Sequence, residues 1–318
     1  MGAIVVAGLV TGVIIVEAAP PDITSSATAS QPAVRLLPPR PHVGGCQVFP
    51  GDNAWNQEIA SAPLRGNSAQ IISHIQAIGS DNLHPDFGEN QSYGIPYIVV
   101  PVDQPAVPIT YDAYGDESDP GPFPIPPNAP VEGGSDAHVL VAQEQTCQLF
   151  ELFAAHRSGS GWTAASGAKF DLNTGALRPI GWTSADAAGL PILPGLVRYD
   201  EVAAGYIGHA IRATFSRTQR GFVLPATHFA SSDPDPTLPA MGMRLRLRAD
   251  FDLNTLSGQA RVIAAAMQQF GLIVADNGSN WFFQGAPDPG WNDEELNQLK
   301  GIPGTAFEVV DTGPVLTG

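Results

Sequence analysis

Glycine and proline recur along the whole chain, with 34 and 30 copies in 318 residues. Usage this high favours short strands and ordered turns over long helices. Apolar runs of strand length, rich in β-branched and aromatic residues, recur between the turn residues. They cover residues 97–100, 107–111, 138–142, 148–153, 206–215, 221–224, 243–251, 272–275 and 281–283.

Helix patterns are fewer. Residues 68–78 carry apolar side chains at Ile71, Ile72 and Ile75 and stop before Gly79, a common helix-ending residue. Residues 259–270 also end before a glycine, and residues 292–299 open with an Asn and an acidic first turn. This mixture predicts a mainly β protein, a single-domain β-sandwich or barrel-like fold with a few peripheral helices.

The charge balance restricts the possible partners. The formal net charge is −16 at pH 7 and the isoelectric point is near 4.6, so the surface repels phosphate backbones. Nucleic acid is therefore not an expected partner. A hydrophobic share of 43% with only 14% charged residues is typical of a folded chain.

The N-terminus has features of an export signal. Residues 3–16 form an apolar run of signal-peptide length, too short for a comfortable membrane span, and Val16-Glu17-Ala18 is a small-x-small cleavage pattern. A basic flank is missing, and a buried strand is the alternative. We expect a signal peptide over 1–18, a Pro/Ser/Thr-rich linker over 19–44, one globular domain over 45–311 and a tail over 312–318. The mature protein would then be secreted or periplasmic, with no stable membrane span.

Cys46 and Cys147 are the only cysteines of the chain. Two thiols in an exported protein usually pair, so we expect a disulfide between them. In a cytosolic protein they would instead be two small core residues. Their spacing matches no metal-binding motif.

One long segment carries acidic groups without basic ones. Between Arg65 and Arg157 there is no Lys or Arg, and the densest acidic part runs from Asp116 to His138. Crowded carboxylates raise each other's pKa unless a cation compensates, so such a loop is either a site or a solvated face. Its candidate acids and bases for glycoside hydrolysis are Asp116, Glu117, Asp119, Glu132 and Asp136. Alternatively, carboxylates of this loop hold Ca²⁺, whose preference for oxygen ligands they suit.

Three arginines alternate with apolar residues in the run that follows Met243. Arg244, Arg246 and Arg248 share one face of the predicted strand. They either pair with carboxylates of neighbouring strands or form a cationic floor for an anionic glycan, in which Arg244 and Arg246 bind the substrate. In the second interpretation the acidic loop and the arginine strand line one cleft.

The histidines offer further candidates. His209 lies on the apolar face of its strand, as a core residue or a buried base, and His228 lies in a loop. His84 and Asp86 share a face of an extended segment, as a metal pair, a base and its orienting group, or an ordinary turn. His138 ends the acidic loop and is a further candidate for substrate or metal.

Residues 181–195 form a long loop of low charge that contains Trp182 and Asp186. Trp182 and Trp281 are flat surfaces on which a sugar ring can lie, although tryptophans of β proteins are more often core residues. Asp186 adds a polar group to the same candidate binding surface. We therefore include Trp182, Asp186 and Trp281 among the substrate-binding candidates.

Several long motifs between residues 84 and 279 resemble those of a set of secreted bacterial proteins without an assigned activity. The motifs are HPDFG, YGIPY, DESDPGPFPIP, GWTSADAAGLPILPGLVRYDEV, PATHFAS and LIVADNGS. The resemblance implies an exported, single-domain protein. It assigns no catalytic role to any residue.

Three functions remain open from these patterns. The first is a secreted enzyme that cleaves a polysaccharide, with carboxylates of the acidic loop as acid and base, on a glycan that can be anionic. The second is a non-catalytic carbohydrate-binding or adhesion module with structural Ca²⁺. The third is a secreted metal-dependent hydrolase that uses His84, Asp86 and His138. In the first two the partner is a polysaccharide or oligosaccharide.

Overall fold

The computed structural model describes residues 40–79 and 81–317, which belong to one compact unit. The predicted signal peptide and most of the predicted linker lie outside these residues. The described chain opens with β1 (His42–Val43), which pairs with β2 (Cys46–Gln47) across a two-glycine turn. A hairpin therefore already occupies the end of the range predicted as linker.

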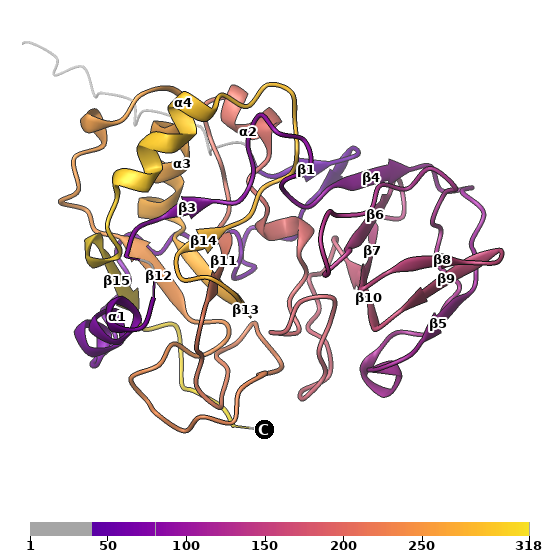
Figure 1. The fold of residues 1–318 in the computed structure, drawn as a ribbon, viewed down its shortest axis with the longest axis horizontal. Coiled ribbons are helices and arrows are strands. Elements are labelled where there is room, and N and C mark those ends of the chain that lie inside the picture. The colour runs from indigo at the N-terminus through magenta and orange to yellow at the C-terminus, as the bar shows by residue number, and fades with distance from the viewer. Residues whose placement is uncertain (1–39, 80, 318) are drawn as a thin grey trace, which may run out of the picture. The chain divides into compact units, whose positions relative to one another are not determined.

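Among the described residues the largest sheet has six strands in the order β15-β12-β13-β11-β14-β3 (Figure 1). The sheet is mixed, because β13 runs parallel to β11 while β12 runs antiparallel to β13. The strands are β3 (His84–Pro85), β11 (Ile211–Phe215), β12 (Arg244–Leu247), β13 (Leu272–Asn277), β14 (Phe282–Phe283) and β15 (Phe307–Val310).

Two smaller sheets lie on the other side of Figure 1. A four-stranded sheet has the order β10-β7-β6-β4, and a three-stranded sheet has the order β5-β9-β8. Their strands are β4 (Tyr97–Val100), β5 (Ile109–Tyr111), β6 (Val139–Gln143), β7 (Gln148–Phe153), β8 (His156–Ser158), β9 (Gly161–Ala164) and β10 (Ser166–Asp171).

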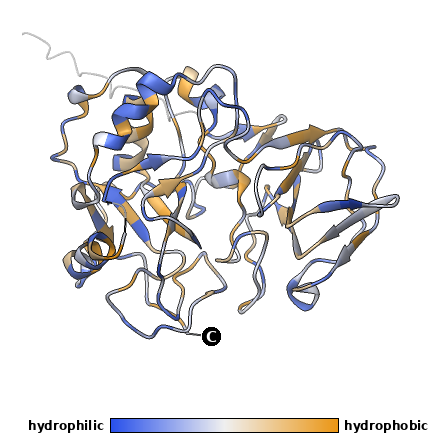
Figure 2. Ribbon diagram, viewed as in Figure 1, coloured by the Kyte–Doolittle hydropathy of each residue, from blue (hydrophilic) through white to orange (hydrophobic). Residues whose placement is uncertain are grey.

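The four-stranded sheet is a layer shared by two hydrophobic cores. On β6, Leu140 and Ala142 belong to the large core, which includes the six-stranded sheet, whereas Val139 and Val141 belong to a smaller core with Phe123 and Trp162. Burial on both faces explains why β6 is apolar at successive positions instead of alternating. In Figure 2, β4 of this sheet has hydrophobic colours, whereas β8 of the three-stranded sheet has hydrophilic ones.

The helices pack against the six-stranded sheet or against each other. They are α1 (Ser68–Ala77), α2 (Tyr199–Ala203), α3 (Gly258–Gln269) and α4 (Asp293–Leu296). α1 contacts β15, and α3 contacts β12 and α4. The apolar side of α1, with Ile71 and Ile75, is buried, as its sequence period predicts. The fold is thus mainly β, sandwich-like and bordered by few helices, as predicted.

A disulfide joins Cys46 and Cys147, which confirms the predicted pair. It ties the β1-β2 hairpin to the turn between β6 and β7, and it closes a loop of about one hundred residues. Loops of this size are expected to stabilise the folded state by up to about 4.7 kcal/mol in the chain-entropy estimate. No helix among residues 40–79 and 81–317 is long and apolar enough to cross a membrane.

Several predicted strands are shorter in the structure. Of residues 206–215 only Ile211–Phe215 form a strand, and of residues 243–251 only Arg244–Leu247 do. The second strand ends because Phe251 turns back to donate to the carbonyl of Arg248. Phe222 makes only isolated bridges, so residues 221–224 form no strand.

Candidate functional site

A pocket of about 560 Å³ lies where the six-stranded and four-stranded sheets meet. Phe153 and Ser166 reach it from β7 and β10, and Asp276 reaches it from β13. The other walls come from two loops, 183–187 and 228–232, and from Tyr114 and Arg220. Its lining comprises Tyr114, Phe153, Ser166, Thr183, Ser184, Ala185, Asp186, Ala187, Arg220, His228, Phe229, Ala230, Ser231, Ser232 and Asp276.

A β-bulge shapes the pocket at β13. The pairing of β11 with β13 shifts between Ala213, opposite Val274, and Thr214, opposite Asp276. The extra residue is Ala275, whose carbonyl accepts a hydrogen bond from Ala188 N at 3.1 Å. Bulges re-aim neighbouring side chains, and this one joins the strand that carries Asp276 to the loop that carries Asp186.

Asp186 forms a buried ion pair with Arg212 of β11. Arg212 Nη2 and Nε donate to the two carboxylate oxygens at 2.8 and 3.2 Å, and Nη1 donates to Gln284 Oε1 at 2.7 Å. Burial raises the pKa of Asp186 and Arg212 opposes this shift. Although burial disfavours the guanidinium, the carboxylate of Asp186 raises the pKa of Arg212. This mutual support keeps a paired charge at the pocket wall.

Asp276 differs from Asp186 because no cation of residues 40–79 and 81–317 lies within ion-pair distance of it, although the charge of Arg212 still lowers its pKa to a lesser degree. Burial, helped by the negative charge of Asp186, raises the pKa of Asp276 to about 7. Its carboxylate accepts a hydrogen bond from the backbone N–H of Asn277 at 2.7 Å. The pocket thus holds two carboxyl groups with different environments, which is the usual way in which acid and base roles are separated.

His228 is oriented by the backbone. Its Nδ1 lies 2.7 Å from the carbonyl of Ala187, so in the neutral ring the proton is on Nδ1 and Nε2 is left as an acceptor. The backbone N–H groups of Thr227 and His228 both donate to the carbonyl of Ala188. The loop that bears His228 is therefore fastened to the loop that bears Asp186.

His138 and Glu132 form a hydrogen-bonded pair that contacts the loop of Asp186. His138 Nδ1 bonds Glu132 Oε2, and Nε2 lies 3.0 Å from the carbonyl of Ala185. Burial lowers the pKa of His138, but the hydrogen bond and the negative charge of Glu132 together outweigh burial, and the net shift is upward. Since both ring nitrogens face acceptors, the protonated ring satisfies both partners.

Two further charged residues hold this segment. Glu151 is fully buried, and its oxygens accept from Ile192 N and Leu193 N at 2.9 to 3.0 Å; burial raises the pKa of Glu151 to about 7. Arg178 Nε donates to the carbonyl of Thr183 at 2.6 Å. Segment 183–193 is therefore a rigid platform for the pocket.

The predicted acids and bases of the acidic loop have other partners in the structure. Asp119 accepts from Arg178 Nη1 at 2.5 Å, and Glu117 accepts from Thr183 N at 2.9 Å. Glu132 bonds His138, while Asp116 and Asp136 are exposed. None of these five carboxylates lines the pocket. Glu117, Asp119 and Glu132 hold segment 183–193 directly or through Arg178 and His138. The carboxyl groups of the pocket lining are Asp186 and Asp276.

The arginine strand does not meet the acidic loop. Arg244 is buried and donates to the carbonyls of Ala54, Gln57 and Phe270. Arg246 pairs with Glu308 at 2.7 Å and lines a separate pocket of about 350 Å³. Figure 1 places β12 far from β5 and β10, beside which the acidic loop lies. The expected shared cleft is thus absent from the described residues, because the nearest acceptors of these guanidinium groups are backbone carbonyls and Glu308.

His84 and Asp86 line a different pocket, of about 410 Å³, together with Lys300. His84 stacks on Phe282 with ring centroids 4.1 Å apart. Burial lowers the pKa of His84 and raises that of Asp86. Both side chains are therefore pushed toward their neutral forms.

His209 is a core residue, the more common environment for a lone histidine on the apolar face of a strand. It is fully buried, with Nε2 3.0 Å from Glu201 Oε2 and Nδ1 2.7 Å from the carbonyl of Ala210. Glu201 also pairs with Arg198 at 2.7 Å. This cluster anchors α2 to the start of β11.

The two tryptophan candidates also lie away from the pocket lining. Trp281 is a core residue that packs on Phe215 and Phe307 and donates from Nε1 to Gln76, so it offers no surface to a sugar. Trp182 is half-buried, and the Arg178 guanidinium lies 5.6 Å from its ring centroid. Its carbonyl accepts from Thr227 at 3.0 Å.

The described residues contain no group of three or more His, Cys, Asp or Glu side chains that could hold a metal ion. For His138 the reason is clear, because Glu132 and Ala185 occupy both ring nitrogens. The set His84, Asp86 and His138 is thus not assembled as metal ligands. Asp119, a candidate for Ca²⁺, is occupied by Arg178.

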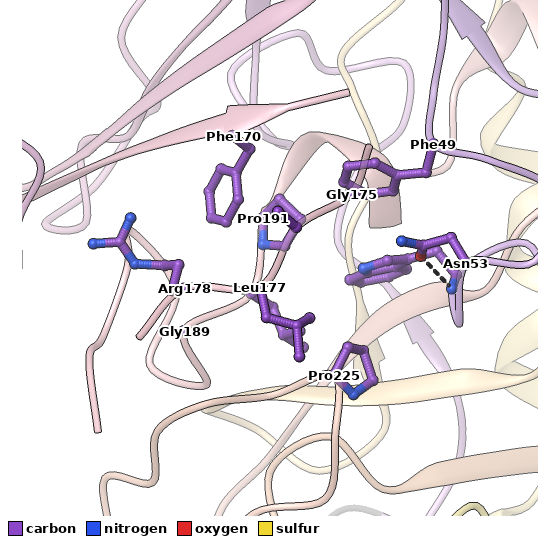
Figure 3. A pocket seen from close by; sticks show the side chains of 12 residues that line it. Phe49, Asn53, Phe170, Gly175, Leu177, Arg178, Gly189, Pro191 and Pro225 are labelled. Carbon is purple, nitrogen blue, oxygen red and sulfur yellow. Dashed lines mark hydrogen bonds between the residues drawn. The ribbon is translucent and has the colours of Figure 1, made fainter. Parts of the chain in front are cut away.

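Behind the 183–190 loop lies a small apolar cavity, shown in Figure 3. Its volume is about 20 Å³, which suffices for one water molecule. Phe49, Phe170 and Leu177 line it, and Figure 3 shows the guanidinium of Arg178 pointing away from it. This cavity is packing space, not a site for a sugar.

Sequence reasoning missed Arg212, Asp276, Glu151 and Arg220. A partial signal existed for Asp276, which follows the apolar run 272–275 and belongs to the motif LIVADNGS. Arg212 alternates with the apolar residues of its strand, as an exposed residue would. The chain matches no protein-family model, no curated protein and no solved structure. Function is therefore inferred from the chemistry of the site.

Proposed function

We propose that this protein is a polysaccharide-cleaving hydrolase whose acid and base lie in the pocket between the sheets. Asp276 is the general acid and His228 is the general base. The observation that carries this proposal is a carboxyl group protonatable near neutral pH in the same pocket as an oriented imidazole whose Nε2 bonds no described residue. Acid–base pairs of this kind contribute about 10² to 10⁴-fold to the rate.

The acid role follows from the environment of Asp276. Its pKa of about 7 leaves a large share of the carboxyl groups protonated at neutral pH, whereas an ordinary Asp is ionised there. A protonated carboxyl can give its proton to the glycosidic oxygen as the C–O bond breaks. The resulting carboxylate is disfavoured by Asp186, which promotes return of the proton.

The base role follows from the orientation of His228. Nδ1–H donates to Ala187, so Nε2 accepts a proton from a water molecule whose oxygen attacks the sugar carbon. One C–O bond forms and one breaks, the water proton goes to Nε2, and the proton of Asp276 goes to the leaving oxygen. Transfer between the two groups through solvent restores the starting state.

The remaining pocket residues suit a sugar chain. Tyr114, Phe153 and Phe229 supply aromatic faces, and Ser231 and Ser232 supply hydroxyl groups. The Asp186–Arg212 pair provides fixed charges that need no rearrangement during the reaction. The Cys46–Cys147 disulfide supports export as part of the proposal, because disulfides persist in oxidising compartments.

The test is a screen of polysaccharides for release of reducing ends, followed by Asp276→Asn and His228→Gln on any substrate that is cleaved. Each variant should lower kcat about 10² to 10⁴-fold with little change in the melting temperature. Asp103→Asn, an exposed carboxylate outside the pocket, is the matched control and should keep full turnover. Full turnover of Asp276→Asn would contradict the acid role. Binding of a glycan that is never cleaved would favour the carbohydrate-binding module.

A further inference from the structure

Arg220 is a cation that lines the pocket. No carboxylate among the described residues lies within ion-pair distance of it. The nearby Asp233 is already engaged by Arg217 at 2.5 Å. Arg220 is exposed to solvent, so its guanidinium is accessible to a ligand that enters the pocket.

The backbone at Arg220 is held in position. Arg220 N donates to the carbonyl of Asp233 at 2.5 Å, and the preceding residue Gln219 is buried with its amide bonded to Leu238. The backbone that carries the Arg220 side chain is therefore held in place at the rim of the pocket. A fixed backbone lowers the entropy lost when a ligand orders the side chain.

The charged groups that line the pocket leave a net positive charge at slightly acid pH. Asp186 is cancelled by Arg212, and Asp276 is largely protonated at slightly acid pH because burial raises its pKa. Arg220 then remains as the uncompensated charge of the lining. A pocket of this kind in a protein of net charge −16 selects an anionic group from its ligand.

We propose that the substrate is a uronic-acid-bearing glycan and that Arg220 binds the carboxylate of one sugar unit. Arg220 would donate two parallel N–H···O hydrogen bonds, the geometry for which a guanidinium is preorganised. The aromatic walls Tyr114 and Phe229 take the sugar faces. This inference names the substrate class of the proposed hydrolase, and it rests on the same pocket.

The experiment measures binding separately from cleavage. In the Asp276→Asn background, affinities are determined by calorimetry for polygalacturonate, alginate, hyaluronan and glucuronoxylan, each beside its carboxyl-reduced counterpart. Adding Arg220→Gln should weaken binding of the preferred anionic polymer about 10- to 100-fold, as expected for charge-assisted bonds. The carboxyl-reduced polymer should bind equally to both proteins.

Arg261→Gln is the matched control, since Arg261 is exposed on α3 and outside the pocket lining. It removes the same charge and should leave all affinities unchanged. The inference is overturned if no anionic polymer binds better than its reduced form, or if Arg220→Gln leaves anionic binding intact.

The two proposals can fail separately. Arg220-dependent binding without cleavage by the wild-type protein would remove the hydrolase and keep the carboxylate site. Cleavage of neutral polymers with full activity of Arg220→Gln would keep the hydrolase and remove the carboxylate site.

Discussion

Two buried arginines in one sheet differ in what faces them. Arg212 of β11 and Arg244 of β12 flank the same strand, β13, and are 3% and 2% exposed. Arg212 meets a carboxylate, Asp186. Arg244 meets the backbone carbonyls of Ala54, Gln57 and Phe270. The first holds the loop of a pocket, and the second ties an early segment to the end of α3.

The pKa values follow this difference. The carboxylate of Asp186 raises the pKa of Arg212, and burial alone lowers that of Arg244 to about 9. A pKa of about 9 still leaves Arg244 protonated at neutral pH. The role of a buried arginine in this protein thus depends on its partner. Arg212 holds a pocket residue, whereas Arg244 only stabilises the fold, because only a carboxylate partner brings a second charge that must stay paired.

Replacing Arg212 should give the largest effect. Arg212→Met leaves Asp186 buried without its cation, so we expect a loss of about 3 to 5 kcal/mol in the free energy of unfolding. Urea denaturation followed by tryptophan fluorescence measures it. The double variant Arg212→Met/Asp186→Leu should regain most of this loss, since no charge is left unpaired. If the double variant is no more stable than the single one, the pair is not what fastens the loop.

Replacing Arg244 should lower the free energy of unfolding by less, and no second substitution should restore it in the same way. Arg244→Met leaves carbonyl acceptors unsatisfied but no opposite charge, so a loss of about 1 to 3 kcal/mol is expected in the same denaturation assay. The pocket should keep its ligand affinity, because Arg244 lies outside its lining. A loss as large as that of Arg212→Met would erase the distinction between the two arginines.

The next largest effect should be on how stability depends on pH, which should differ between a pocket variant at Asp276 and a variant at Arg244. The raised pKa of Asp276 means that the folded state binds its proton more tightly than the unfolded chain, so this contribution is fully present below about pH 4 and is lost as the pH rises through about 7. Glu151, with a pKa of about 7, acts in the same direction. Stability measured across this range should therefore fall less steeply with pH in Asp276→Asn than in the wild type. Arg244→Met should keep the wild-type slope; equal slopes in Asp276→Asn and wild type would contradict the raised pKa.

The smallest effect should come from Arg248, which follows β12. Its pair with Asp250, at 2.9 Å, is exposed on both sides, so water and salt screen it. Arg248→Gln should leave the midpoint of urea denaturation unchanged. A clear loss would show that exposure alone does not separate this arginine from Arg212 and Arg244.

Much of the fold could be predicted because it depends on local patterns. The helical periods of α1 and α3 and the apolar runs of β4, β6, β7 and β13 are properties of neighbouring residues. The Cys46–Cys147 pair was predictable by elimination, since two cysteines allow one bond. Residues 221–224 show the limit, because this apolar run makes only isolated bridges, from Phe222 to Met241 and to Leu316, and forms no strand.

The site was only partly predictable. Asp186 and His228 were candidates and line the pocket, whereas the carboxylates of the acidic loop bind Arg178, His138 or backbone groups. Counting charges along the chain located an acidic segment but not the cations that neutralise it. The charge pattern along the chain did not point to Asp276, because its raised pKa comes from burial and from Asp186, ninety residues away.

The amino-acid pattern by itself determined a mainly β fold with few helices, an acidic surface and a single possible disulfide, because periodicity, net charge and cysteine number are summed over the chain. Tertiary structure alone decided which charges meet. Arg212 rather than Arg244 contacts a pocket residue, Asp186, whose loop is joined to β13 at the bulge. Electrostatic roles depend on distance and burial, and these are set only when strands far apart in sequence pack together.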